Sequence, residues 1–141
     1  MSPSANEEAK PQEEPRRLET EEALRIAARA ASDRKATDMV ALDLREIASF
    51  TEFFLICTGA NPRQVQAISD AVQEELRKAG KRPLHAEGYS NAEWILVDYG
   101  DFIVHIFSSA SRKFYDLERL WRDAKKVDMD EAVRGEADAR Q

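Results

Sequence analysis

The sequence contains little of what most enzyme sites require. Its 141 residues include one cysteine, two histidines and five glycines. The single cysteine, Cys57, cannot form an internal disulfide, and its place in an apolar run indicates a small core residue in a reducing compartment. The few glycines form neither a P-loop nor a dinucleotide-binding fingerprint. We therefore expect no phosphate cradle and no cofactor.

Long apolar runs are also missing. No stretch approaches the roughly 18 apolar residues of a membrane span, and residues 1–17 lack the apolar centre of a signal peptide. We expect a cytoplasmic protein without membrane contact. The net charge of −6 gives the chain no general attraction to nucleic acid phosphates, so direct sequence-specific nucleic acid binding is not expected. Basic surfaces are the favoured partners of such a chain.

Neither histidine is predicted to be a metal ligand. His85 and His105 lie 20 residues apart, and no cysteine or carboxylate stands at zinc spacing around them. His105 lies in the middle of an apolar strand, which indicates a structural or solvent-facing role. A thiol nucleophile built from Cys57 and His105 is disfavoured, because an apolar environment raises the pKa of a thiol and leaves it inert.

Composition divides the chain into one domain and two tails. Residues 1–17 are rich in Glu, Pro, Ser and Lys, and we predict that they are disordered. Residues 126–141 alternate charged residues with Ala and Gly, which predicts a flexible tail. The domain between them, residues 18–125, is long enough to bury a core without a disulfide or a metal.

Within this domain, apolar spacing and turn residues predict the secondary structure. A first helix begins at Thr20 as its cap, and a second follows the cap Asn61 and ends at Gly80. Ser111 caps a final helix, whose apolar stripe is Phe114, Leu117, Leu120 and Trp121. Strands are expected at residues 39–44, 53–58, 94–99 and 102–107, the last two as a hairpin through Gly100-Asp101. This order predicts an α/β (α+β) fold with a mixed sheet flanked by helices.

Metal-assisted phosphoryl transfer is the enzymatic alternative. It requires carboxylates that converge on a divalent ion such as magnesium, and the candidates are Asp43, Asp98 and Asp101. Asp98 and Asp101 flank the hairpin turn and lack the two-residue spacing that would direct both side chains to one ion. Carboxylates at turns usually bond the turn backbone instead. A nucleotidyltransferase-like enzyme therefore remains the second hypothesis.

The residues around Trp94 suggest a binding surface. Trp94 follows a polar loop, and Tyr89 and Tyr99 lie close to it in sequence. Aromatic residues beside carboxylates have the composition of a binding hot spot with an acidic rim. The carboxylates in question are Glu87, Glu93, Asp98 and Asp101. Burial of Trp94 in the core is the alternative, and the pattern alone favours it.

Several separated motifs resemble the ribosomal silencing factor family, also called Iojap-like proteins. The resemblance covers residues 20–124. In the first half it is carried by Asp43-Leu44, by the run from Phe50 to Gly59, and by Arg63-Gln64-Val65. In the second half it is carried by Glu87-Gly88, the run from Trp94 to Asp101, Ile103-Val104-His105, Arg112, Tyr115, Leu117-Glu118 and Leu120-Trp121. Glu52 and Asn61 depart from the usual family residues but keep their chemical type.

The resemblance implies a function by binding rather than by catalysis. It implies a nucleotidyltransferase-like fold without catalytic carboxylates and without a metal site. It also implies attachment to large-subunit protein fourteen, steric exclusion of the small ribosomal subunit, repression of translation under nutrient limitation, and homodimers off the ribosome. The partner-binding residues are then expected to be Glu87, Trp94, Asp98, Asp101 and Tyr115.

Overall fold

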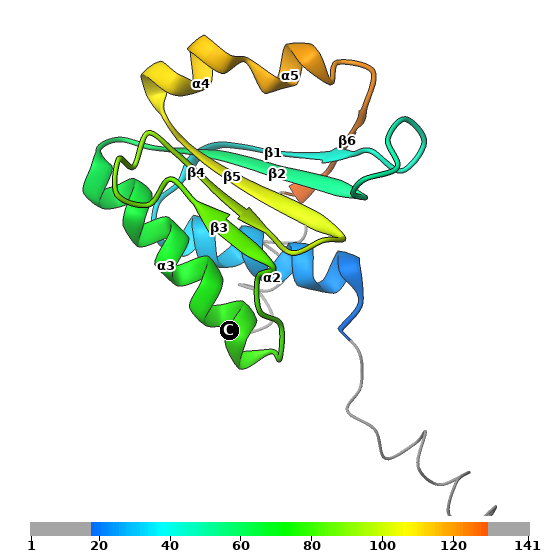
Figure 1. Cartoon of the computed structure of the whole chain (residues 1–141), viewed down its shortest axis with the longest axis horizontal. Helices are drawn as coiled ribbons and strands as arrows, with labels where there is room; N and C mark the ends of the chain where they lie inside the picture. The colour runs from blue at the N-terminus through cyan, green and yellow to red at the C-terminus, as the bar shows by residue number, and fades with distance from the viewer. Residues whose placement is uncertain (1–17, 130–141) are drawn as a thin grey trace, which may run out of the picture.

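Six strands form one mixed sheet, and helices cover both of its faces (Figure 1). The computed structural model describes residues 18–129. The strands are β1 (Thr37–Asp43), β2 (Phe53–Gly59), β3 (His85–Glu87), β4 (Trp94–Asp98), β5 (Phe102–Ser108) and β6 (Lys125–Val127). The helices are α2 (Thr20–Asp33), α3 (Pro62–Lys78), α4 (Ser109–Tyr115) and α5 (Leu117–Leu120). The predicted α/β (α+β) class with a mixed sheet in a single domain is confirmed.

The sheet is built around β2 and β5. The strand order is β3-β4-β5-β2-β1-β6; β2 and β5 run parallel, and every other neighbouring pair is antiparallel. All seven residues of β2 are buried, as expected for a strand that is covered on both faces. The hairpin of β4 and β5 through Gly100-Asp101 is also confirmed.

Two long helices, α2 and α3, cover one face of the sheet. The predicted stripe of α3 is fully buried and consists of Val65, Ile68, Val72 and Leu76. Asn61 caps this helix by accepting a hydrogen bond from the Gln64 amide, and Pro62 occupies its first turn, as predicted. α2 buries mainly alanines, and these small side chains let the helix lie close to α3 and the sheet.

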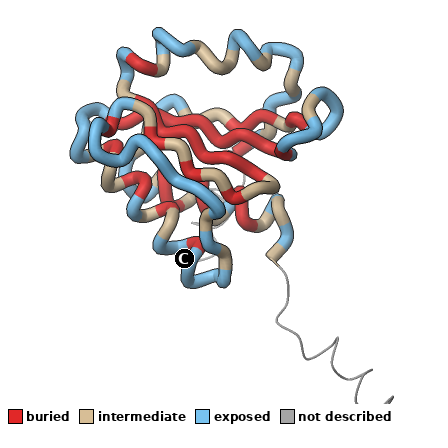
Figure 2. Tube along the Cα trace, in the orientation of Figure 1, coloured by how far each residue is buried: buried red, intermediate tan, exposed pale blue. Residues whose placement is uncertain are grey.

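The other face has a thinner cover, made of α4 and α5. Leu117 and Trp121 pack against the sheet here, over a cluster that includes Phe54 and Phe107. Figure 2 shows the contrast between the buried central strands and the α4–α5 segment, most of which is exposed or half-buried. This segment is short, so it covers the apolar strands without burying its own outer side.

The polar side chain of His105 is buried beneath this cover. His105 lies on β5, is 3% exposed, and contacts the ring of Phe54 edge-on at a centroid distance of 4.5 Å. Loss of hydration disfavours the charged imidazolium and lowers the pKa of His105 to about 3. The imidazole is therefore neutral at physiological pH.

The structure corrects three details of the predicted helices. Thr20 is the first residue of α2 rather than its cap, and its hydroxyl donates to Asp101 instead. The predicted final helix is capped by Ser108 rather than Ser111. It is also broken in two, because Asp116 adopts a left-handed conformation with φ 50°. Aspartate tolerates this conformation better than most residues do, which makes Asp116 a suitable position for the break.

The sequence reading also missed two strands. β3 and β6 are each three residues long, which is too short to show an alternating pattern. β6 pairs with β1, and Met129 is buried in the core. The predicted domain boundary after residue 125 is therefore wrong, because residues 126–129 belong to the fold. The predicted tail 1–17 and the remainder of the second, residues 130–141, lie outside the described residues.

Gly88 fixes the approach of the loop after β3 to the start of β4. A Cβ atom on Gly88 would clash with the backbone carbonyl oxygen of Trp94, whereas a Cβ atom on Gly80 would meet nothing within 4 Å. Both glycines have a φ near +90°. Gly80→Ala should therefore cost only the left-handed strain, about 1 to 2 kcal/mol of unfolding free energy. Gly88→Ala should cost about 3 kcal/mol or more, since the backbone must also move. Equal losses in urea unfolding of the two variants would contradict this account.

The buried neutral His105 predicts acid sensitivity. Below its ordinary pKa of 6.5, the unfolded chain binds a proton that folded His105 does not bind until about pH 3. Stability should therefore fall as the pH drops through this window, by up to about 1.4 kcal/mol per pH unit. Between pH 7 and pH 5, wild-type protein should lose about 2 kcal/mol more than His105→Leu. Urea unfolding of both proteins at each pH measures this difference, and parallel losses would count against it.

Candidate partner-binding surface

Three of the expected binding residues share one face of the sheet. Trp94 and Leu96 of β4 pack on the α4–α5 side, and Ile95 and Val97 face the opposite core. Side chains alternate along a strand, so Asp98 lies on the same side as Trp94. Glu87 of β3 pairs with Leu96 and therefore also lies on this side.

The indole of Trp94 lies between the sheet and α4. Its ring centroid is 5.0 Å from that of Phe107 and 4.6 Å from that of Tyr115, at the end of α4. Its Nε1–H donates a hydrogen bond of 3.1 Å to Nδ1 of His105. Trp94 is half-buried, so it is neither a core residue nor a free surface side chain. The structure thus brings Trp94 and Tyr115 together.

Large apolar side chains continue outward from this pair. Phe114 is 79% exposed, Leu120 is 72% exposed and Tyr115 is 48% exposed. The rings of Phe114 and Tyr115 meet edge-on at 5.0 Å. Phe114, Tyr115 and Leu120 line one open hollow of about 410 Å³. We call Trp94, Phe114, Tyr115 and Leu120 the apolar patch, because monomeric proteins rarely leave such contiguous side chains uncovered unless they bind something.

Sequence reasoning missed Phe114 and Leu120 as surface residues. It placed both in a buried helical stripe, which assumes one continuous helix through residue 121. The break at Asp116 changes the direction in which the following side chains point. As a result Leu117 and Trp121 reach the sheet, while Phe114 and Leu120 do not. Asp116 was the available signal, since aspartate is common at the start of a new helix.

Arg112 holds the two short helices together across this break. Its Nε and one terminal nitrogen donate to both carboxylate oxygens of Glu118 at 3.0 and 2.9 Å. The other terminal nitrogen donates to the Thr58 hydroxyl at 2.8 Å, which ties α4 to the end of β2. The hydrogen bonds from Arg112 to Glu118 lower the pKa of the Glu118 carboxyl group and keep it ionised. Arg112 therefore fixes the position of the patch on the sheet.

The charges closest to the patch are mostly basic. Lys113, Arg119 and Arg122 are exposed and line the same hollow, together with Asp116. The expected carboxylates lie elsewhere on this face. Glu87 is exposed on β3, and its carboxylate Oε2 lies 3.1 Å from Nε2 of His85. Asp98 accepts a hydrogen bond from the Gly100 amide at 2.8 Å. The surface is thus basic near Tyr115 and acidic along β3 and β4.

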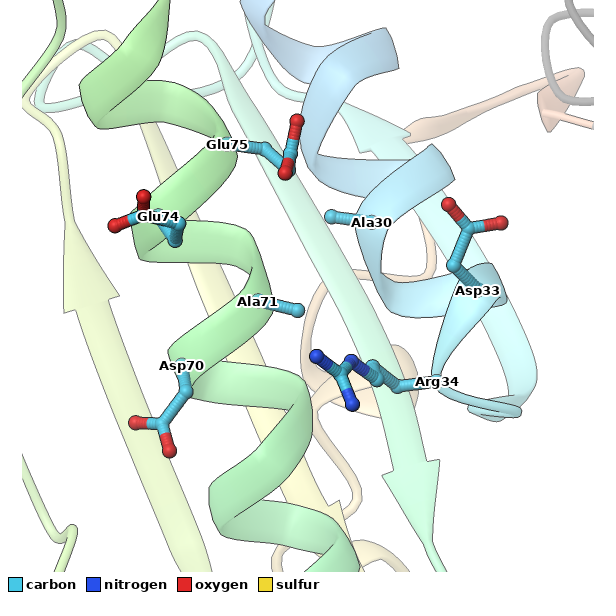
Figure 3. Close-up of a pocket in the computed structure, with 7 residues that line it drawn as sticks. All are labelled: Ala30, Asp33, Arg34, Asp70, Ala71, Glu74 and Glu75. Atoms are coloured by element: carbon cyan, nitrogen blue, oxygen red, sulfur yellow. The ribbon is translucent and has the colours of Figure 1, made fainter.

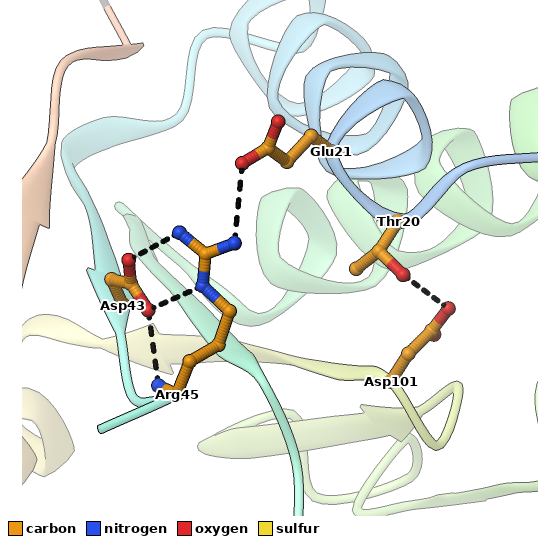
Figure 4. Close-up of polar contacts among 5 residues, drawn as sticks. All are labelled: Thr20, Glu21, Asp43, Arg45 and Asp101. Atoms are coloured by element: carbon orange, nitrogen blue, oxygen red, sulfur yellow. Dashed lines mark hydrogen bonds and ion pairs between the residues drawn. The ribbon is translucent and has the colours of Figure 1, made fainter. Parts of the chain in front are cut away.

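Asp101 is engaged inside the molecule rather than on this surface. It accepts hydrogen bonds from the Thr20 hydroxyl at 2.9 Å and from Lys81 at 3.3 Å. Figure 4 shows the first of these contacts, between the hairpin turn and the first turn of α2. Its side chain is only 25% exposed. Asp101 therefore joins three segments of the fold and is poorly placed to face a partner beside Trp94.

The carboxylates of the enzymatic alternative do not converge. Asp43 on β1 and Asp98 on β4 are separated by β2 and β5, which is about 14 Å at the usual strand spacing. Asp43 is paired with Arg45, whose hydrogen bonds lower the pKa of the carboxyl group (Figure 4). Within residues 18–129, no group of three His, Cys, Asp or Glu side chains could hold a metal ion. Burial raises the pKa of the Cys57 thiol to about 12, which makes it a poor nucleophile.

A second hollow, of about 540 Å³, lies between α2 and α3 (Figure 3). It is lined by Ala30, Asp33, Arg34, Asp70, Ala71, Glu74 and Glu75. Three of its four carboxylates already have partners: Glu74 pairs with Arg77, Glu75 pairs with Lys78, and Asp70 accepts a hydrogen bond from Tyr89. This groove therefore offers less unsatisfied chemistry than the apolar patch does.

In the described part of the chain, no helix has the length and apolar character needed to cross a membrane. Residues 17–141 match the family model described as "Ribosomal silencing factor during starvation". The chain is 42% identical to the ribosomal silencing factor of Bacillus subtilis over 107 residues, which is 76% of this chain and 91% of that protein. It is 35% identical to the chloroplastic Iojap protein of Zea mays over 102 residues, which is 72% of this chain and 44% of that protein.

Solved structures agree with these relatives. A crystal structure from Chromobacterium violaceum has a TM-score of 0.72 and 38% identity, and the match covers 74% of this chain and 87% of that one. A crystal structure from Bacillus halodurans has a TM-score of 0.69 and 38% identity, and the match covers 77% of this chain and 99% of that one. Taken with the fold and the motifs described above, these matches show that the chain belongs to the ribosomal silencing factor family.

Proposed function

We propose that this protein binds the large ribosomal subunit in the cytoplasm through the apolar patch and thereby prevents the small subunit from joining. The observation that carries the proposal is the placement of Trp94 against Tyr115, with Phe114 and Leu120 exposed beside them. The names of its relatives support the ribosome as the target. In this mechanism the protein occupies volume that the small subunit must enter, so translation is repressed without a covalent step. We accordingly propose a binding function and no enzymatic activity.

Large-subunit protein fourteen is the proposed contact, on the resemblance of the motifs around Trp94 and Tyr115 to those of the family. The apolar patch would supply most of the affinity, because desolvated aromatic side chains dominate binding free energies. Glu87 and Asp98, on the same face, would meet basic side chains of the partner and speed its encounter. Lys113, Arg119 and Arg122 would require acidic groups opposite α4 and α5.

Co-sedimentation with separated ribosomal subunits tests the function. Purified protein should travel with the large subunit in a sucrose gradient and should not travel with the small one. When both subunits are present, its addition should reduce the fraction of joined ribosomes. Protein that stays at the top of the gradient at moderate salt would contradict the proposal, and nucleotide and magnesium binding would then be the next measurement.

Trp94→Ala should weaken binding to the large subunit by about 2 kcal/mol or more, which is roughly a 30-fold rise in Kd. The physical reason is loss of the half-buried indole that joins the sheet to Tyr115. Tyr89→Ala is a matched control, because Tyr89 is a 44% exposed aromatic residue that contacts Asp70 of α3 instead. Circular dichroism should show that both variants are folded. Unaltered binding by folded Trp94→Ala would remove Trp94 from the interface.

Leu120 and Leu84 form a second matched pair. They are 72% and 76% exposed, but Leu84 lies before β3, beside Gly100, and is outside the patch. Leu120→Ser should weaken large-subunit binding about tenfold, through loss of one apolar side chain that the bound subunit would bury. Leu84→Ser should leave binding unchanged. Neither substitution should lower the melting temperature, since neither side chain is packed. Equal effects of the two on binding would contradict the assigned surface.

Off the ribosome, we propose that two copies associate as a homodimer, which would cover part of this exposed apolar surface. Sedimentation equilibrium of the same pair of variants tests this. Leu120→Ser should dissociate at higher protein concentration than Leu84→Ser, because it lacks one of the apolar side chains that the dimer covers. A wild-type protein that is monomeric at all concentrations would rule out the dimer.

A further inference from the structure

The pair formed by Trp94 and His105 has a feature that packing alone does not explain. His105 is 3% exposed and surrounded by aromatic rings, with Phe54 at 4.5 Å, Trp94 at 5.9 Å and Phe107 at 6.2 Å. Its same-face neighbours along β5 are the apolar residues Ile103 and Phe107. An apolar side chain of similar size would suit this environment, yet the position holds an imidazole.

The hydrogen bond from Trp94 determines the tautomer of this imidazole. Nδ1 accepts the indole N–H at 3.1 Å, so in the neutral ring the proton must be on Nε2. Burial keeps the ring neutral, because it lowers the pKa of His105 to about 3. Nε2 is buried and has no hydrogen-bond partner among residues 18–129. A buried donor without an acceptor is destabilising, so the Nε2 of His105 lowers the stability of the fold. What the residue provides at this position is an acceptor, Nδ1, for the indole of Trp94.

That acceptor acts on a side chain of the proposed interface. Trp94 is half-buried, and its indole contacts the rings of Phe107 and Tyr115, whose own centroids are 6.4 Å apart. Ring contacts of this kind allow an indole to slide or flip, whereas a hydrogen bond at Nε1 selects one orientation. A side chain that is already fixed loses less conformational freedom when its partner binds.

We propose that His105 is a positioning residue, which fixes the Trp94 indole in the orientation that the partner recognises. This inference rests on the proposed function, because it assigns His105 a role in large-subunit binding. His105 contacts no partner itself and acts through Trp94. Its effect on binding should therefore exist only when the indole N–H is present.

Two substitutions of nearly the same shape separate positioning from packing. His105→Leu removes the acceptor and fills the apolar site. His105→Asn can place an amide oxygen close to the position of Nδ1, but it buries a polar amide in a strand. Positioning predicts that His105→Leu keeps or raises the melting temperature at pH 7 and weakens large-subunit binding about tenfold. It predicts that His105→Asn lowers the melting temperature and keeps binding within about threefold of wild type.

The indole N–H gives a direct readout in a ¹⁵N–¹H spectrum. The chain has two tryptophans, so two indole signals are expected, and Trp94→Phe identifies the one from Trp94. This signal should be shifted downfield and protected from exchange in wild-type protein and in His105→Asn. In His105→Leu it should move upfield and exchange faster, while the Trp121 signal should change little.

A double-substitution cycle closes the test. In the Trp94→Phe background, which retains an aromatic ring without an N–H, His105→Leu should cause no further loss of large-subunit binding. An equal loss in both backgrounds would overturn the inference, as would wild-type binding by His105→Leu. Affinity that follows melting temperature across wild type, Leu and Asn would make His105 a packing residue instead. If wild-type protein fails to bind large subunits, the proposed function itself fails. If wild-type protein binds and His105→Leu binds equally well, only the role of His105 fails.

Discussion

Seven residue pairs join β2 to β5 in parallel, and the other layers depend on this pairing. Two parallel neighbours cannot be connected by a tight turn, so the chain between them must leave the sheet and return. α3 is the crossover helix of that connection, and the antiparallel strands β3 and β4 are added before the chain re-enters at β5. Because both central strands are apolar on each face, the fold needs a cover on both sides.

The two covers differ, and the candidate site results from that difference. α2 and α3 contain 14 and 17 residues, whereas α4 and α5 contain 7 and 4. Eleven helical residues bury the strands beneath them only if Leu117 and Trp121 turn inward, which leaves Phe114 and Leu120 outside. The Arg112–Glu118 pair and the Thr58 hydroxyl hold this arrangement in place. The two helices that carry the exposed apolar side chains are therefore tied to each other and to the sheet.

Long apolar patterns made most of this fold predictable. The stripe of α3, the Asn61 cap and the hairpin at Gly100-Asp101 each follow from a strong local rule, and the structure confirms them. β3 and β6 were not predicted, because a strand of three residues is too short to show a periodic pattern. The surface was harder to read, because it depends on Asp116, a single residue whose left-handed backbone changes the direction of every side chain after it. The role of Asp101 was unpredictable for a related reason: its partners, Thr20 and Lys81, are distant in sequence.

Both tryptophans of the chain belong to the thinly covered side of the sheet. Trp94 lies on β4 beside Tyr115, and Trp121 follows α5 and contacts Phe54 at 5.8 Å. The α2–α3 layer contributes no indole. Fluorescence excited at the long ultraviolet wavelengths that only tryptophan absorbs therefore comes entirely from the α4–α5 side. An emission change on mixing with another molecule therefore reports events at this side, without any attached dye. The same signal is nearly blind to local opening of α2 and α3, which must be followed by other means.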